Sequence, residues 1–173
     1  MDVLISEAEI QERVTAIAHE IHRDFDGRPF TVVGILTGSL VFLADLIRSI
    51  ELPHQIGLLQ ASSYRGATTE AGTLVVNDSL LAEIRGRHIL LLDDILDTGA
   101  TLSRLVEHLH HRGAASIRTA VLLRKVGRQT VHFEPDYVGF SIPNKFVIGY
   151  GLDFNDDYRH LPYIGVLPDD TVA

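Results

Sequence analysis

One stretch constrains the fold more than any other: His88 to Gly113, with the sequence HILLLDDILDTGATLSRLVEHLHHRG. Its four consecutive apolar residues, Ile89 to Leu92, are typical of a strand that is buried on both faces of a sheet. After a short polar loop, apolar residues recur with the spacing of a helix at Leu102, Leu105, Val106 and Leu109. A strand, a tight loop and a helix make half of a βαβ unit, which predicts an α/β fold with a parallel sheet.

The loop of this unit combines acidic residues with a turn suited to a phosphate. Asp93 and Asp94 end the apolar run, and Asp97 follows them. The small residues 98–101 direct free backbone N–H groups and the positive end of a helix dipole at one spot, which favours an anion. Three carboxylates would repel that anion unless a divalent cation lies between the charges or ligand hydroxyls donate to the carboxylates. A sugar phosphate bound with magnesium satisfies both conditions.

Two other strands are expected to reach the same edge of the sheet. Residues 30–36 form an apolar run, Thr37-Gly38-Ser39 makes a short loop, and a second amphipathic helix follows. This second strand–loop–helix unit is a second candidate anion site. A partly β-branched strand over residues 117–123 delivers Lys125 just beyond its end, where open α/β sheets bind ligands.

The remaining segments complete one domain over residues 1–173. Ser6 and Glu9 have the spacing of a capping box, which predicts a helix over residues 7–24. Strands are expected at residues 56–62 and 72–76, and the small polar residues 63–72 between them suit a lid that excludes water. The last third is rich in strands and is expected to form a separate cap, with extended segments over residues 137–142, 145–151 and 164–167.

Composition narrows the class of protein. The net charge of −8 argues against a broad surface for nucleic acid or an anionic membrane, and the absence of cysteine excludes disulfides and thiolate catalysis. The first residues lack the pattern of a signal peptide, so we expect a cytoplasmic protein. Lysine occurs only at Lys125 and Lys145, against thirteen arginines, which favours special roles for both lysines.

The segment LLLDDILDTGATL resembles the diphosphoribosyl-binding signature of the type I phosphoribosyltransferases. Four further segments occur in an order similar to that of the hypoxanthine-guanine phosphoribosyltransferases: GILTGSLVFLADL, SSYRG, LLRK and PDYVGFSIPNKFVIGYGLDFNDDYR. The resemblance covers nearly the whole chain. It implies a twisted, mainly parallel sheet flanked by helices, a small C-terminal strand-rich hood, and a homodimer or homotetramer. The implied reaction transfers the 5-phosphoribosyl group of 5-phosphoribosyl 1-pyrophosphate (PRPP) to N9 of a 6-oxopurine in purine salvage.

The resemblance also implies roles for single residues on the sugar side. Asp97 would face purine N7 and act as general acid or base, because a proton leaves the base as the glycosidic bond forms. Asp93 and Asp94 would hold the ribose hydroxyls, directly or through magnesium-bound water. The 5′-phosphate would be bound by Thr98, Gly99, Ala100 and Thr101.

On the base side, Lys125 would donate to purine O6, and Phe146 would stack on the purine ring. Val147 would offer backbone hydrogen bonds to the base edge. Lys145 matches a family lysine near O6 and the acid pair.

The pyrophosphate side completes the implied site. Arg159 would bind pyrophosphate with its planar guanidinium, and Ser63 and Tyr64 would anchor the lid. The backbone of the loop would contribute from Leu36, Thr37 and Gly38. The magnesium ligands would be Asp93, Asp94 and Asp153.

The chain departs from the family pattern at Thr37, where many members carry lysine, and at Gln129, where some carry arginine. The peptide bond between Leu36 and Thr37 is often cis in the family. Two other functions stay open on the sequence: a regulatory protein that senses PRPP or nucleotides with the same fold, and a phosphoribosyltransferase that prefers xanthine or guanine.

Overall fold

The computed structural model describes residues 1–64 and 73–168 of the chain. Its centre is a six-stranded sheet in the order β4-β3-β2-β5-β6-β7, in which only β4 runs antiparallel to its neighbour. The strands are β2 (Phe30–Leu36), β3 (His54–Tyr64), β4 (Thr73–Asn77), β5 (His88–Leu96), β6 (Ser116–Lys125) and β7 (Tyr137–Ile142). The expected mainly parallel sheet is confirmed.

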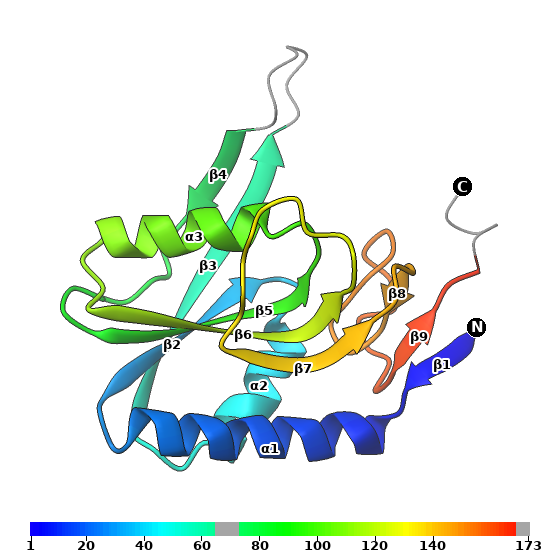
Figure 1. Cartoon of the computed structure of the whole chain (residues 1–173), viewed down its shortest axis with the longest axis horizontal. Coiled ribbons are helices and arrows are strands. Elements are labelled where there is room, and N and C mark those ends of the chain that lie inside the picture. Colours follow the sequence, from blue (N-terminus) through cyan, green and yellow to red (C-terminus); the bar gives the residue numbers. More distant parts are fainter. Residues whose placement is uncertain (65–72, 169–173) are drawn as a thin grey trace.

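Helices cover both faces of this sheet (Figure 1). On one face lie α1 (Glu7–Phe25) and α2 (Leu40–Ser49), and on the other lies α3 (Ala100–His111). Successive residues of β5 alternate between the two cores: Leu90 and Leu92 join the cluster with α1 and α2, whereas Ile89 and Leu91 join the cluster with α3. The unbroken apolar run of β5 therefore follows from burial on both faces.

Strand β5 continues beyond its apolar run and includes the acid pair, which the sequence pattern placed only at the end of that run. Asp93 pairs with Val121 of β6, and the pairing extends to Leu96. Backbone hydrogen bonding in a parallel ladder does not depend on the side chain, so the two acids extend the strand. The acid pair is therefore part of the sheet itself, on a more rigid support than a loop would give.

A separate three-stranded sheet, in the order β1-β9-β8, forms the hood. It contains β8 (Val147–Ile148), β9 (Ile164–Val166) and β1 (Asp2–Ile5). Of these three strands, only β1 was not predicted from the sequence. The expected extended segment over residues 145–151 is strand only at β8, because Gly149, Tyr150 and Gly151 all have positive φ and turn the chain. Figure 1 shows the N-terminal strand and β9 side by side at one edge of the molecule.

Within residues 1–64 and 73–168, no helix is long and apolar enough to cross a membrane. The predicted helix over residues 7–24 corresponds to α1, and the predicted capping box is present. The Glu9 amide donates to Ser6 Oγ at 3.3 Å, and the Ser6 amide donates to the Glu9 carboxylate at 2.8 Å. Two backbone donors that would otherwise lack a partner are thereby satisfied.

Replacing Ser6 by Ala removes the acceptor for the Glu9 amide and should lower the free energy of unfolding by about 1 kcal/mol. Ser6→Asn keeps a side-chain acceptor at the same position and should lose much less. Urea denaturation of the two variants and the parent chain measures the difference. Equal losses in both variants would show that the cap does not stabilise α1.

Candidate active site

Two clefts meet at the end of β5. The lysine cleft has about 500 Å³ of empty space and is lined by Asp94, Ile95, Asp97, Lys125, Phe146, Val147, Leu152 and Asp153. The loop cleft has about 630 Å³ and is lined by Ile35, Ala61, Asp93, Asp94, Ile95, Leu96, Asp97, Thr98, Gly99, Thr101 and Leu102. Because Asp94, Ile95 and Asp97 line both, the two clefts form one continuous site at the carboxyl edge of the sheet.

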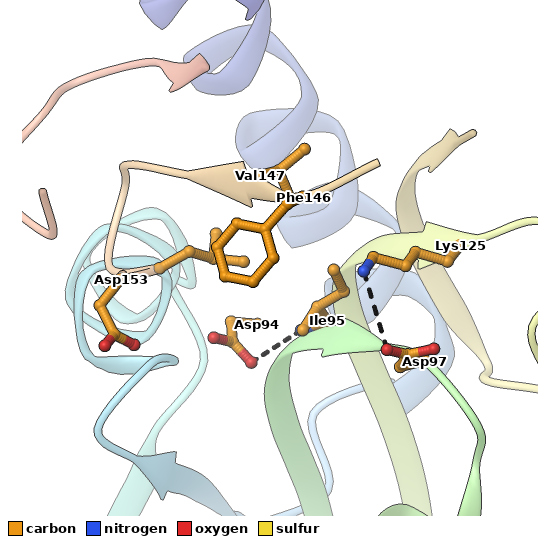
Figure 2. Close-up of a pocket in the computed structure, with 8 residues that line it drawn as sticks. Asp94, Ile95, Asp97, Lys125, Phe146, Val147 and Asp153 are labelled. Atoms are coloured by element: carbon orange, nitrogen blue, oxygen red, sulfur yellow. Dashed lines mark hydrogen bonds and ion pairs between the residues drawn. The ribbon is translucent and has the colours of Figure 1, made fainter. Parts of the chain in front are cut away.

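The hood forms the roof of the lysine cleft. Figure 2 shows the Phe146 ring projecting into the cleft above Asp94, with Lys125 and Asp97 to one side and Asp153 on the other. Phe146 is 37% exposed as a whole residue, and the ring of Phe154 packs against its ring edge to face, with ring centroids 5.5 Å apart. An aromatic face that is open to a cleft can stack on a flat ligand.

Asp97 lies between two cations. One carboxylate oxygen is 2.9 Å from Arg128 Nε, and the other is 3.7 Å from Lys125 Nζ. The Lys125 side chain is only 13% exposed, so its ammonium group is directed into the cleft rather than into solvent. Sequence reasoning missed Arg128, although a basic residue in the loop after β6 is a recognisable signal at this edge of the sheet.

The acid pair is held by backbone amides. The Asp94 amide donates to Asp93 Oδ1 at 3.0 Å, and the Ile95 amide donates to Asp94 Oδ1 at 2.8 Å. Burial, together with the charge of Asp94, raises the pKa of Asp93 well above its usual range. Burial also raises the pKa of Asp94, although hydrogen bonds and the charge of Arg159 oppose the shift. Two adjacent acids in this environment favour a positive charge beside them.

The loop before α3 has backbone amides available at the helix start. Gly99 adopts the left-handed conformation (φ 87°) next to the first residue of the helix, Ala100. The Thr98 carbonyl accepts hydrogen bonds from the Thr130 and Val131 amides, at 3.0 and 3.2 Å. The β6–β7 connection thus hydrogen-bonds this carbonyl and holds the loop in place. The backbone amides at the start of α3 suit an anion.

The loop after β2 lies against both the acid pair and the hood. The Leu36–Thr37 peptide bond is cis, as expected, and the Thr37 side chain is exposed. Gly38 has no room for a side chain, because a β-carbon there would overlap the Asp94 carboxylate. A β-carbon on Gly151 of the hood would in turn overlap the Gly38 carbonyl. Gly38 is therefore in direct contact with both Asp94 and Gly151.

Asp153 and Arg159 lie together on the hood side. Arg159 donates to the Gly151 carbonyl at 2.8 Å and forms an ion pair with Asp153 at 3.0 Å. The arginine predicted for pyrophosphate and the acid predicted for magnesium are therefore neighbours. Their opposite charges suit the two parts of a metal–pyrophosphate ligand.

Six of the predicted residues do not line either cleft: Leu36, Thr37, Gly38, Ala100, Lys145 and Arg159. Lys145 is exposed in the turn between β7 and β8, outside both clefts. Ser63 and Tyr64 end β3, where their backbones pair with Leu74 and Thr73. The rest of the predicted lid, residues 65–72, lies outside the described residues.

Comparison with known proteins decides the family. Residues 6–155 match the phosphoribosyl transferase domain family. A hypoxanthine-guanine phosphoribosyltransferase of Streptococcus pneumoniae is 41% identical over 171 residues, which cover 99% of this chain and 95% of the relative. This chain belongs to the hypoxanthine-guanine phosphoribosyltransferase family.

Solved structures of the hypoxanthine-guanine phosphoribosyltransferase family have the same fold. The enzyme of Bacillus anthracis is 38% identical, with a TM-score of 0.92 and coverage of 97% of this chain and 99% of the other. The hypoxanthine phosphoribosyl transferase of Trypanosoma cruzi is 36% identical, with a TM-score of 0.92 and coverage of 99% and 93%. The expected type I phosphoribosyltransferase fold is confirmed.

The raised pKa of Asp93 leads to a prediction about stability. The folded chain binds the Asp93 proton more tightly than the unfolded chain, so protonation of Asp93 stabilises the folded state. This contribution to the free energy of unfolding is fully present below the ordinary aspartate pKa of about 3.9. It is lost as pH rises through the raised pKa of the folded chain. At neutral pH without ligands, Asp93→Asn should therefore unfold at higher urea concentration than the parent. The difference should shrink as pH is lowered toward 4. A variant that is less stable than the parent at pH 7 would contradict the burial of an uncompensated charge.

Proposed function

We propose that this chain transfers the 5-phosphoribosyl group of PRPP to N9 of hypoxanthine and of guanine, and so forms IMP or GMP and pyrophosphate in purine salvage. One observation carries the proposal: Asp97 and Lys125 face each other beside the Phe146 ring, in a cleft continuous with the acid pair and the helix-start loop. Such a site can hold a flat base, a sugar and a phosphate in that order. Family membership supports the same reaction.

The lysine cleft would bind the purine. The Phe146 ring would stack on the base, the backbone at Val147 would contact the base edge, and Lys125 would donate to the 6-oxo group. The low exposure of the Lys125 side chain supports this role, because a buried ammonium group needs an acceptor. Lys145, which is exposed outside the clefts, would act on O6 only after the turn that carries it moves.

The loop cleft would bind the sugar phosphate. The 5′-phosphate would accept hydrogen bonds from the loop and the start of α3, and the ribose hydroxyls would donate to Asp93 and Asp94. The loop residues are Thr98, Gly99, Ala100 and Thr101. The backbone of this loop fits an anion, since a helix start offers amides that have no partner within the helix.

Pyrophosphate would lie between the loop after β2 and the hood. Leu36, Thr37 and Gly38 would offer backbone groups, and Arg159 would offer its guanidinium. Because Thr37 is neutral, the charge of the leaving group would rest mainly on Arg159 and on magnesium. Ser63 and Tyr64 would anchor a lid over this ligand.

The acids of the site fit magnesium. Among residues 1–64 and 73–168, no three acidic or histidine side chains lie close enough to hold a metal alone. Magnesium is usually held by one or two carboxylates together with substrate phosphates and water. Asp93 and Asp94 on the sheet and Asp153 on the hood offer such carboxylates on two sides of the cleft. When bound, the ion would neutralise charge on the leaving pyrophosphate.

Asp97 would move the proton. The bond between ribose C1′ and the pyrophosphate oxygen breaks, pyrophosphate leaves with the electron pair, and purine N9 bonds to C1′. The proton on N7 then passes to the Asp97 carboxylate. The cationic sugar that develops at C1′ would be favoured by the nearby acid pair, and the lid would exclude the water that would otherwise hydrolyse PRPP.

A substrate panel tests the proposed reaction. With PRPP and magnesium, the chain should convert hypoxanthine and guanine to nucleotides and give no useful turnover of adenine, uracil or orotate. Adenine presents an amino donor where Lys125 also donates, so both donors would lack partners in the closed site. Efficient turnover of adenine would refute the assignment of Lys125. Binding of PRPP without turnover of any base would support a regulatory protein that senses PRPP. A preference for xanthine would support a phosphoribosyltransferase that prefers xanthine or guanine.

Asp97→Asn keeps the shape of the side chain and removes the base. Turnover of hypoxanthine should fall by roughly 10²–10⁴-fold, whereas the dissociation constant of PRPP should change far less. Asp2→Asn, an equivalent change at an exposed position of β1, serves as the control and should leave turnover intact. Near-normal turnover by Asp97→Asn would remove this residue from the chemistry.

We also propose that the chain assembles as a homodimer or homotetramer. The C-terminal region of the T. cruzi relative has a role in its oligomeric state and activity. In this chain, β9 pairs with the N-terminal strand β1, and near this pairing Met1 and Val3 are 55% and 57% exposed. Exposed apolar side chains of this kind suit a subunit contact.

A further inference from the structure

Tyr150 is an unusual residue of the hood. Its backbone lies in the left-handed region (φ 51°), which a side chain other than glycine rarely adopts, and the residue is only 2% exposed. A conformation of this kind persists where the surroundings hold it firmly, and such positions gather at functional sites. The Tyr150 hydroxyl donates to Asp45 Oδ2 at 2.6 Å.

Asp45 belongs to α2, the helix that begins directly after the loop of Thr37 and Gly38. Its carboxylate also accepts a hydrogen bond from Gln11 of α1 at 3.1 Å and pairs with Arg48. Burial opposes ionisation of Asp45, but the hydrogen bonds from Tyr150, Gln11 and Arg48 outweigh it and lower the pKa. The hydroxyl of Tyr150 is thus held by a charged acceptor that is itself fixed by two helices.

The backbone around Tyr150 contacts two groups of the pyrophosphate side. Gly151, the next residue, is in contact with the Gly38 carbonyl so closely that no β-carbon fits between them. The Gly151 amide donates to the Arg159 carbonyl at 3.0 Å, and the Arg159 guanidinium donates back to the Gly151 carbonyl at 2.8 Å. A shift of Tyr150 would therefore move Gly151, and with it both the Gly38 contact and Arg159.

We infer that Tyr150 is a positioning residue for the pyrophosphate half of PRPP. Its hydrogen bond to Asp45 joins the helix that follows the Gly38 loop to the part of the hood that carries Arg159. The bond holds the two groups at a fixed separation. This inference rests on the proposed function, because it assigns the Gly38 loop and Arg159 to pyrophosphate. The purine is held elsewhere, by Lys125 and Phe146, and depends less on this bond.

The molecule contains a matched control. Tyr137, at the start of β7, is also 2% exposed, and its hydroxyl donates to Asp24 Oδ2 at 2.9 Å. Asp24 lies in the last turn of α1, and Tyr137 begins its parallel strand, so this pair lies at the edge of the sheet opposite the clefts. Tyr137→Phe and Tyr150→Phe each remove one hydroxyl from a buried tyrosine–aspartate pair.

The experiment compares both variants with the parent chain in stability and kinetics. Both should lose stability in urea. Only Tyr150→Phe should raise the KM for PRPP and the inhibition constant of pyrophosphate, by roughly fivefold, the effect of one ordinary hydrogen bond. The KM for hypoxanthine should change by less than about twofold, because the purine loses no hydrogen bond in this variant. Loss of one ordinary hydrogen bond to the purine would change that KM by more than this.

Two outcomes would overturn the inference. One is equal weakening of PRPP and hypoxanthine in Tyr150→Phe, and the other is the same kinetic change in Tyr137→Phe. If Tyr150→Phe does not fold, Asp45→Asn weakens the same bond from the other side and should show the same selective loss. Where both variants fold, their effects in the double variant should not add, because they act on one interaction. Turnover by the parent chain in the same assay tests the proposed function separately.

Discussion

Strand β5 pairs in parallel with β2 on one side and with β6 on the other, and this pairing decides which side chains meet in the cleft. Parallel strands end at a common edge, so the acids of β5, the loop after β2 and Lys125 of β6 come together although they lie far apart in the sequence. Helices on both faces bury the strand and fix its register. The hood adds the Phe146 ring and the Arg159 guanidinium above this edge.

The acid pair shows how stability and function oppose each other here. Two carboxylates sit side by side in a partly buried site, and the shift in the pKa of Asp93 records the cost of charging them. A ligand that brings positive charge or hydroxyl donors to this site would offset the unfavourable free energy of the two charges. Asp97 is different, because its own partners Arg128 and Lys125 balance it within the chain. Neighbouring acids on one strand and loop therefore have separate electrostatic roles.

Much of this arrangement could be predicted from the sequence, because it depends on local patterns. The apolar run of β5, the capping box of α1 and the turns after β2 and β5 are each encoded within a few residues. Lys125 was also identified, from its place beyond a buried strand. What the sequence did not predict depends on contacts between distant segments. Strand β1 is too short to recognise alone, and the bond from Tyr150 to Asp45 joins residues 105 positions apart.

The connection between β6 and β7 lies on the surface, yet it contacts both halves of the site. Arg128 in this connection holds Asp97, and the amides of Thr130 and Val131 hold the Thr98 carbonyl. Surface connections usually accept insertions and deletions, because little depends on their path. Here a change of one residue in length would shift the arginine relative to the two amides, so that only one of the two contacts could be kept. We therefore expect this segment to tolerate exchange of side chains better than a change of length.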